Sequence, residues 1–260
     1  MIELPPDEFV AVIPLFETID HSAAVVFSVL ERRHPGQVFV DRRDQPATAL
    51  LYVQDAFFYA AGAIPVDIQH TLLPVIFDDI LPRLDEPEMV LFTFSDTWRT
   101  ALDAALAEKG AIRIMRKMFA FSEARFMASQ TNRAELPAGA VIQPIDAELV
   151  RAFPQYQALQ DPATRRFGVC LRRGGEILSE CTACFVGRGE AEIDIQTRED
   201  FRGQGLAFLT AGAFIELCLQ KGLTPNWACW PEREASWKLA LKLGFTEQPD
   251  VPAHLWAPEM

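Results

Sequence analysis

The stretch Ile193-Asp-Ile-Gln-Thr-Arg-Glu-Asp-Phe-Arg-Gly-Gln-Gly-Leu-Ala207 decides how the second half of the chain folds. Its first residues are predicted to form a strand that ends near Thr197, and a strongly apolar helix is predicted to begin by Gly205. Backbone N–H groups at a helix start lack intrahelical partners, and the helix dipole adds partial positive charge there. Because Gly203 and Gly205 have no Cβ, an anion can approach this backbone closely. The stretch therefore predicts an anion site, to which Arg202 adds a charge-assisted contact.

A glycine turn that precedes a helix without binding any ligand is the simpler alternative. Two other phosphate-binding loops do not fit. A dinucleotide fingerprint needs a third glycine and a parallel βαβ unit, whereas the strands predicted before this loop, at 167–171, 176–185 and 190–197, form an antiparallel meander. A Walker loop needs a Lys followed by Ser or Thr, and this loop has neither.

The elements on either side complete a recognisable order. A short strand at 141–143 and a helix at 147–159 are predicted before the meander. After the apolar helix come a strand at 226–230 and a helix at 232–243 that stops at Gly244.

Arg202-x-x-Gly205-x-Ala207 after an antiparallel strand resembles the pyrophosphate loop of the GNAT N-acetyltransferase superfamily, in its bacterial GNAT acetyltransferase branch. The resemblance extends to the next strand and to the helix Ser236-Trp-Lys-Leu-Ala-Leu-Lys-Leu-Gly-Phe245, which ends in the Gly-Phe pair of that family. It covers about residues 138 to 248. The resemblance implies a GNAT fold, in which a mixed, largely antiparallel sheet is flanked by helices.

The first half is predicted to be a separate α/β (α+β) domain that is a degenerate GNAT-like unit, although no loop motif supports this. The polar stretch from Met127 to Gly139 has almost no large apolar side chains, so we place the boundary there, between domains 1–127 and 138–260. The elements predicted in the first half are helices at 7–19, 21–32, 66–80 and 96–109, and strands at 37–41, 47–54, 57–61, 89–94 and 112–121.

The resemblance also implies acetyl-coenzyme A as the cosubstrate, lying in a wedge between the strand that ends at Thr197 and the strand that starts near Asn226. The pantetheine arm is expected on backbone groups, and the pyrophosphate on the loop. The residues expected to bind it are Ile195, Gln196 and Thr197 for the arm, and Arg202, Gly203, Gln204, Gly205, Leu206 and Ala207 for the pyrophosphate. The implied reaction is direct attack by an amine on the thioester.

Such a reaction needs a base that takes the proton of the amine. Glu192 and Asp194 alternate onto one face of the strand that reaches the thioester, so they are the candidate catalytic residues. We favour Glu192 slightly because its longer side chain reaches further. The alternative is that both are ordinary carboxylates on the solvent-exposed face of a strand.

The sequence departs from the superfamily at the acid that protonates the leaving thiolate. Where many members have a Tyr, this chain has Ala240, and a common Asn is replaced by Arg233. Either the thiolate leaves without help, or Ser236, Cys229 or another group substitutes. A catalytically weakened acyl-coenzyme A-binding module, which senses cofactor or mediates an interaction, is therefore the alternative function.

Composition limits the partners. The net charge of −12 disfavours nucleic acid, whose binding depends on clustered Lys and Arg, and suits a small-molecule amine. No apolar stretch approaches the ~18–20 residues of a membrane span, and the five cysteines suit reduced thiols, so we expect a cytoplasmic protein. Cys181 and Cys184 have metal-ligand spacing but are predicted to face opposite sides of a strand, so no metal is expected. The oligomeric state and the identity of the amine are left open.

Overall fold

A computed structural model of the protein describes residues 1–54, 57–131, 135–159 and 166–258. The chain forms two compact units: unit 1 is Met1–Arg116 with Val251–Met260, and unit 2 is Lys117–Asp250. The division therefore lies at Arg116 rather than in the polar stretch at 127–139, of which residues 132–134 lie outside the described part. That stretch overlaps helix α5 (Glu123–Gln130), whose Phe126 is fully buried in the core of unit 2.

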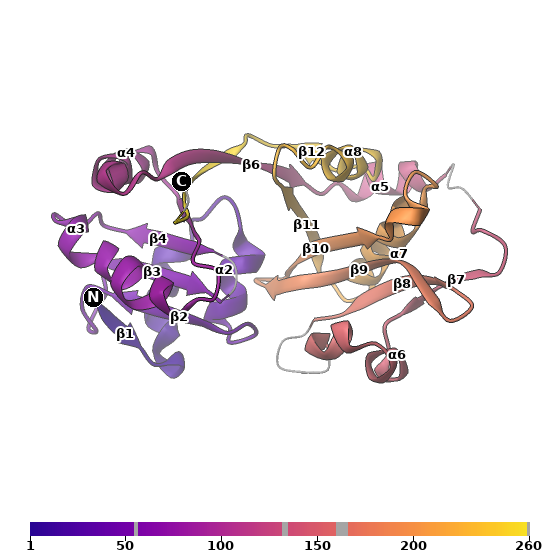
Figure 1. Ribbon diagram of the computed structural model, residues 1–260, viewed down its shortest axis with the longest axis horizontal. Helices are drawn as coiled ribbons and strands as arrows, with labels where there is room; N and C mark the ends of the chain where they lie inside the picture. Colours follow the sequence, from indigo (N-terminus) through magenta and orange to yellow (C-terminus); the bar gives the residue numbers. More distant parts are fainter. Residues whose placement is uncertain (55–56, 132–134, 160–165, 259–260) are drawn as a thin grey trace. The chain divides into compact units, whose positions relative to one another are not determined.

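The sheet of unit 1 is mixed, and its strands follow an order that is not the order of the sequence (Figure 1). The order is β1 (Ile2–Leu4), β2 (Gly36–Val40), β3 (Thr48–Val53), β4 (Phe58–Gly62), β5 (Met89–Thr93), β13 (Val251–Trp256) and β6 (Ile112–Ala120). Among these described strands, only the pair β4–β5 is parallel.

The sheet of unit 2 repeats the same pattern. Its order is β7 (Ala140–Pro144), β8 (Gly168–Arg173), β9 (Glu176–Gly187), β10 (Glu190–Thr197), β11 (Thr224–Cys229), β6 and β12 (Thr246–Glu247). Among the strands described here, only β10–β11 is parallel. The predicted mixed, largely antiparallel sheet is confirmed, and the matching order shows that the first half repeats the sheet arrangement of the second.

Strand β6 takes part in both sheets. Its residues from Ile112 to Arg116 pair with β13 in unit 1, whereas Lys117 to Phe119 pair with β11 in unit 2. The strand next to β5 in unit 1 is β13, which comes from the far end of the described chain. It is held there by His254, whose Nε2 lies 2.9 Å from the Asp103 carboxylate on the neighbouring helix α4 (Asp96–Leu106).

The helices of unit 2 cover the two faces of its sheet. Helix α7 (Leu206–Gln220), the strongly apolar helix predicted to begin by Gly205, is apolar nearly all round and packs on β8, β9 and β10. Helix α6 (Ala147–Ala152) and the 3-10 helix η5 (Pro154–Leu159) pack around Cys170 of β8, away from the core that α7 covers (Figure 1). Helix α8 (Glu234–Lys242) follows β11.

Prolines divide three of the predicted helices, because a proline lacks the N–H and its ring clashes with the preceding turn. Pro154 separates α6 from η5, and Pro74 separates α3 (Ile68–Thr71) from the π-helix η2 (Val75–Ile80). The predicted helix at 7–19 is instead a 3-10 helix, η1 (Pro6–Val12), and a single α-turn, α1 (Ile13–Phe16), with Pro14 at its start.

The remaining helices of unit 1 agree with the predictions in type. They are α2 (Ala23–Leu30), α4 and the short 3-10 helix η4 (Ala107–Lys109) that continues it. A further 3-10 helix, η3 (Leu81–Arg83), lies just beyond the predicted helix at 66–80 and was not predicted. In the described part of the chain, no helix combines the length and the apolar character needed to cross a membrane.

Gly244 at the end of α8 generates a stability prediction. It has φ +89°, and a Cβ added there lies 2.5 Å from backbone atoms of Arg125 and Phe126. Gly222 has φ +69° with nothing within 4 Å of its added Cβ, so it is the matched control. We expect Gly222→Ala to cost about 1–2 kcal/mol of the free energy of unfolding, the usual cost of the left-handed conformation. Gly244→Ala will cost clearly more because backbone atoms must move, and equal losses in urea denaturation would contradict this.

Candidate functional site

The site begins where two parallel strands of unit 2 separate. Strands β10 and β11 pair only from Glu190 to Glu192, opposite Thr224 to Asn226. Beyond that point β11 pairs with β6, while β10 continues to Thr197 along β9. The register of β9 and β10 shifts between Glu192 and Ile193, and such irregularities increase the local twist of strands. One edge of β10, from Ile193 to Thr197, therefore has no strand beside it among the described residues.

The pairing also shows which backbone groups face this open edge. The N–H of Thr224 donates to the carbonyl of Gly189, so odd-numbered residues of this part of the chain face β11. Backbone groups alternate along a strand, so Ile195 and Thr197 face the open edge. The carbonyl of Gln196 instead accepts a hydrogen bond of 3.0 Å from Ser179 of β9. Of the three residues predicted to bind the pantetheine arm, Ile195 and Thr197 thus have backbone groups on the open edge, and the carbonyl of Gln196 faces β9.

The predicted pyrophosphate loop leads directly from this edge into α7. A 3-10 turn, η6 (Glu199–Phe201), is followed by Gly203 at φ +76° and Gly205 at φ +79°. A Cβ added at either glycine meets nothing within 4 Å, so the backbone is open to a ligand. Gly205 caps α7 without a side-chain hydrogen bond, and the first turn holds no acidic residue. The N–H groups of that turn are available to an anion.

Two arginines flank the loop, and they differ in their partners. The side chain of Arg198 lies 3.3 Å from the Glu176 carboxylate and 3.6 Å from that of Asp200. The Nε of Arg202 donates to the carbonyl of Thr197 at 3.2 Å, and no described carboxylate forms an ion pair with it. Arg202 is therefore the cation held beside the helix start with its charge left for an anion.

The two candidate bases lie on β10 at different depths. Glu192 is 3% exposed and stands at the last paired position before the strands separate. Asp194 retains solvent access, yet the surrounding protein raises its pKa by desolvation, against the opposing effects of Arg166 and of a hydrogen bond from Gln196. Both carboxylates thus lie within the strand that forms one wall of the open wedge.

The structure shows the surroundings of the residues considered for the acid that protonates the leaving thiolate. Ala240, at the position where a Tyr is common, is fully buried in the core and offers no polar group. Ser236 lies one turn earlier on α8, and its oxygen accepts a hydrogen bond of 3.1 Å from the indole N–H of Trp227. Cys229 is buried, and Arg233 is the residue that precedes α8. Of the proposed substitutes, Ser236 is the one that keeps partial solvent access.

Two polar contacts near the wedge were not predicted. The hydroxyl of Tyr156 on η5 donates to the Glu180 carboxylate of β9, and burial raises the pKa of this tyrosine. The hydroxyl groups of Ser179 and Thr197 are 2.9 Å apart, next to the bond from Ser179 to Gln196. Cross-strand register places Ser179 opposite Thr197, and the position of η5 beside β9 brings Tyr156 to Glu180. The pattern of a single segment contains neither arrangement.

The two cysteines with metal-ligand spacing, Cys181 and Cys184, both lie on β9. Cys181 is fully buried and Cys184 is half-buried, and the described residues hold no group of three side chains suited to a metal ion. Trp227 is 1% exposed and packs against Phe245.

Known proteins resemble this chain over nearly its whole length. The sequence profile of the family described as GNAT acetyltransferase matches residues 13–253. The uncharacterized N-acetyltransferase YdfB of Bacillus subtilis is 29% identical over 229 residues, which cover 85% of each protein.

Solved structures show the same fold. A GCN5-related N-acetyltransferase-like protein from Streptococcus suis matches 96% of this chain and 98% of its own, with a TM-score of 0.66 and 22% identity. A tandem GNAT protein from the clavulanic acid biosynthesis pathway matches 98% and 97%, with a TM-score of 0.67 and 13% identity. The second match agrees with the repeated strand order of the two units.

The raised pKa of Asp194 generates a prediction about stability. The folded protein holds the proton of Asp194 more tightly than the unfolded chain does, so stability is lost as pH rises through the raised pKa. We expect Asp194→Asn to raise the melting temperature at pH 7, and this gain to vanish below about pH 3.9, the ordinary aspartate pKa. Asp200→Asn, at a carboxylate 79% exposed, is the control and should give no such gain. A lower melting temperature for Asp194→Asn at pH 7 would refute the desolvation argument.

Proposed function

Because the chain belongs to the GNAT acetyltransferase family, we propose that it transfers an acetyl group from acetyl-coenzyme A to the amine of a small molecule. The observation that carries the proposal is the open edge of β10. It continues into the start of α7, which has no side-chain cap and has Arg202 beside it. An extended arm that carries amide groups can form hydrogen bonds with an open strand edge, and a pyrophosphate can bind the N–H groups of a helix start.

In the proposed complex, Ile195 and Thr197 form backbone hydrogen bonds with the pantetheine arm. The pyrophosphate accepts hydrogen bonds from the N–H groups between Gly203 and Ala207. Both glycines are required there because a side chain at either would occupy the space of the ligand. The cosubstrate is thus bound mainly by backbone, which explains why few specific side chains are needed along this wall.

The chemistry follows from the position of the carboxylates. The amine nitrogen attacks the thioester carbonyl, a carboxylate on β10 takes the proton of the amine, and the carbon–sulfur bond breaks. We favour Glu192 as the base, since it stands at the apex of the wedge. The thiolate leaves with a proton from solvent or with a hydrogen bond from Ser236, because Ala240 supplies none.

An acidic protein suits this acceptor. The net charge of −12 attracts a protonated amine to the surface and repels nucleic acid. All five cysteines are free thiols, which agrees with a reducing compartment such as the cytoplasm.

The buried Ala240 favours a second candidate, an acyl-coenzyme A-binding sensor without turnover. Release of free thiol in the presence of amines separates the two.

Cosubstrate binding is tested by thermal shift. Acetyl-coenzyme A at ~100 times its dissociation constant should stabilise the protein by roughly 2.7 kcal/mol. Gly205→Glu should abolish the shift, because a carboxylate then occupies the pyrophosphate position. Gly189→Glu is the matched control: this glycine also has positive φ and open space, but it lies in the β9–β10 turn, so the shift should persist. An unchanged melting temperature in the wild type would refute the assignment.

The base is tested by paired substitutions. Glu192→Gln or Asp194→Asn, whichever removes the base, should lower turnover by roughly 10²–10⁴-fold. Affinity for acetyl-coenzyme A should stay unchanged, because the backbone from Ile195 to Ala207 is intact in both variants. Turnover of free thiol and the dissociation constant are measured for each. Near-wild-type turnover in both variants would mean that the proton goes elsewhere.

A further inference from the structure

Unit 1 contains the counterpart of the wedge, but it is closed. The repeated strand order makes β4 and β5 equivalent to β10 and β11. Residues Phe58 to Ala60 remain paired with Leu91 to Thr93, which is the last residue of β5. Strand β13 pairs with the other edge of β5. Among the described residues, β4 continues only through Ala61 and Gly62 beyond this pairing, whereas β10 continues from Ile193 to Thr197, so the edge left for a pantetheine arm is much shorter.

The loop equivalent to the pyrophosphate loop has also changed its chemistry. Its sequence is Ala63-Ile-Pro-Val-Asp67, without a glycine. The carboxylate of Asp67 caps α3 by accepting the N–H of His70 at 3.0 Å, so a negative charge occupies the place where unit 2 offers N–H donors. A phosphate is repelled from this position.

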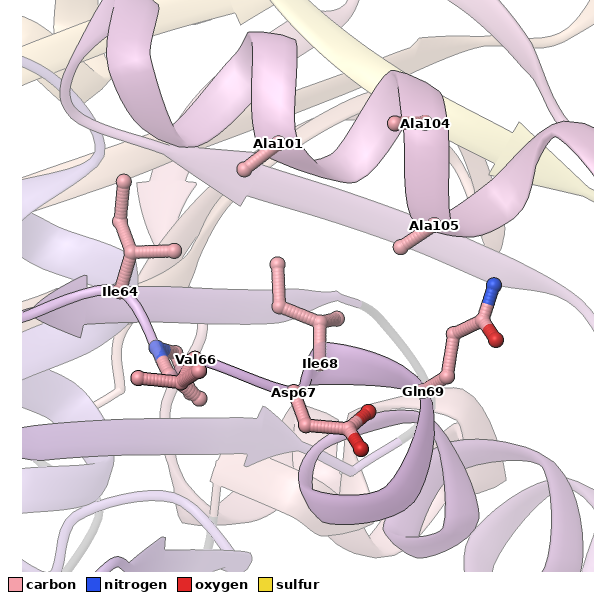
Figure 2. Close-up of a pocket in the computed structure, with 9 residues that line it drawn as sticks. Ile64, Val66, Asp67, Ile68, Gln69, Ala101, Ala104 and Ala105 are labelled. Atoms are coloured by element: carbon pink, nitrogen blue, oxygen red, sulfur yellow. The ribbon is translucent and has the colours of Figure 1, made fainter.

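A cleft nevertheless persists between this loop and α4, the equivalent of α8. It has a volume of about 440 Å³, within the usual range of small-molecule sites. Figure 2 shows Ile64, Val66 and Ile68 on one side and the alanines of α4 on the other. The side chain of Val66 is fully exposed and adds an apolar group to the edge of the cleft.

The rim of the cleft carries one fixed charge. Asp67 lines the cleft with Gln69 at its polar end, and its side chain is 55% exposed. Hydrogen bonds from the His70 backbone and side chain lower the pKa of Asp67, so the carboxylate stays ionised. Apolar walls with one carboxylate at the rim match a ligand that has an apolar body and a cationic end.

We propose that the cleft of unit 1 binds an organic cation with an apolar body, such as a protonated alkylamine, and does not bind coenzyme A. This goes beyond the proposed transfer reaction, because it assigns a separate ligand to the unit that lacks the acetyl-coenzyme A loop. It does not depend on that reaction, because the cleft is lined by residues 64–69 and by Ala101, Ala104 and Ala105, all of unit 1.

The test uses the full chain with isotope-labelled alanine methyl groups, titrated with hexylammonium and, in parallel, with hexanoate. The methyl signals of Ala101, Ala104 and Ala105 report on this cleft alone, so binding of the amine in unit 2 does not interfere. We expect saturable shifts with hexylammonium, with an affinity roughly tenfold above that for hexanoate at low salt, the sum of one attraction and one repulsion at a partly exposed charge.

Three variants sharpen the test. Asp67→Asn keeps the helix cap and should remove most of the difference between the two ligands. Ala104→Trp fills the cleft from an exposed position and should weaken hexylammonium binding at least tenfold at Ala101 and Ala105. Ala107→Trp, equally exposed but outside the cleft, should leave it unchanged.

Several results would overturn the proposal. These are the absence of saturable shifts in the wild type, equal affinity for the cation and the anion, and insensitivity to Ala104→Trp in a variant whose circular dichroism shows normal folding. Shifts of the same methyl groups by coenzyme A in the Gly205→Glu variant would also overturn it. If unit 2 transfers no acetyl group, the methyl signals of Ala101, Ala104 and Ala105 still report whether the cleft of unit 1 binds its ligand.

Discussion

The end of pairing between β10 and β11 after Glu192 is the constraint on which the rest of unit 2 depends. A sheet that opens leaves backbone donors and acceptors without partners, which is costly unless water or a ligand satisfies them. Here the opened edge continues into the start of α7, where more N–H groups lack partners. The fold thus concentrates backbone groups without strand or helix partners along one line, with Glu192 near one end and Arg202 near the other.

The two units show how small the differences are between an open and a closed form of one scaffold. Their strands have the same order and the same single parallel pair among the described residues. In unit 1 the pair stays closed to the end of β5, and Asp67 stands where unit 2 has Gly205. A carboxylate in place of a glycine changes the helix start from an acceptor of anions to a repeller of them. Sheet topology alone therefore does not identify a cosubstrate site.

The sequence predicted those structural features that depend on residues close together in the chain. The loop from Arg202 to Ala207 and helix α7 could be read directly, because glycine geometry and apolar periodicity are local properties. Strand β13 was not predicted, because Pro252 within it argues against a central strand and because its partners β5 and β6 lie far away in the chain. The burial of Glu192 and the hydrogen bond from Ser179 to the carbonyl of Gln196 depend on register across strands. The hydrogen bond from Tyr156 to Glu180 depends on the position of η5 beside β9. No single segment encodes either arrangement. The helix breaks at Pro74 and Pro154 were readable in principle, because proline chemistry is local.

The shared strand β6 and the displaced strand β13 have a consequence for synthesis. Unit 1 requires residues 251–256 to fill the place between β5 and β6, yet these follow the whole of unit 2 along the chain. During translation, the edge of β5 stays unpaired while more than a hundred further residues emerge, since unit 2 spans Lys117–Asp250. An unpaired strand edge is prone to pair with another chain. The aggregation hazard of this protein is therefore set by ribosomal transit time as well as by its final stability.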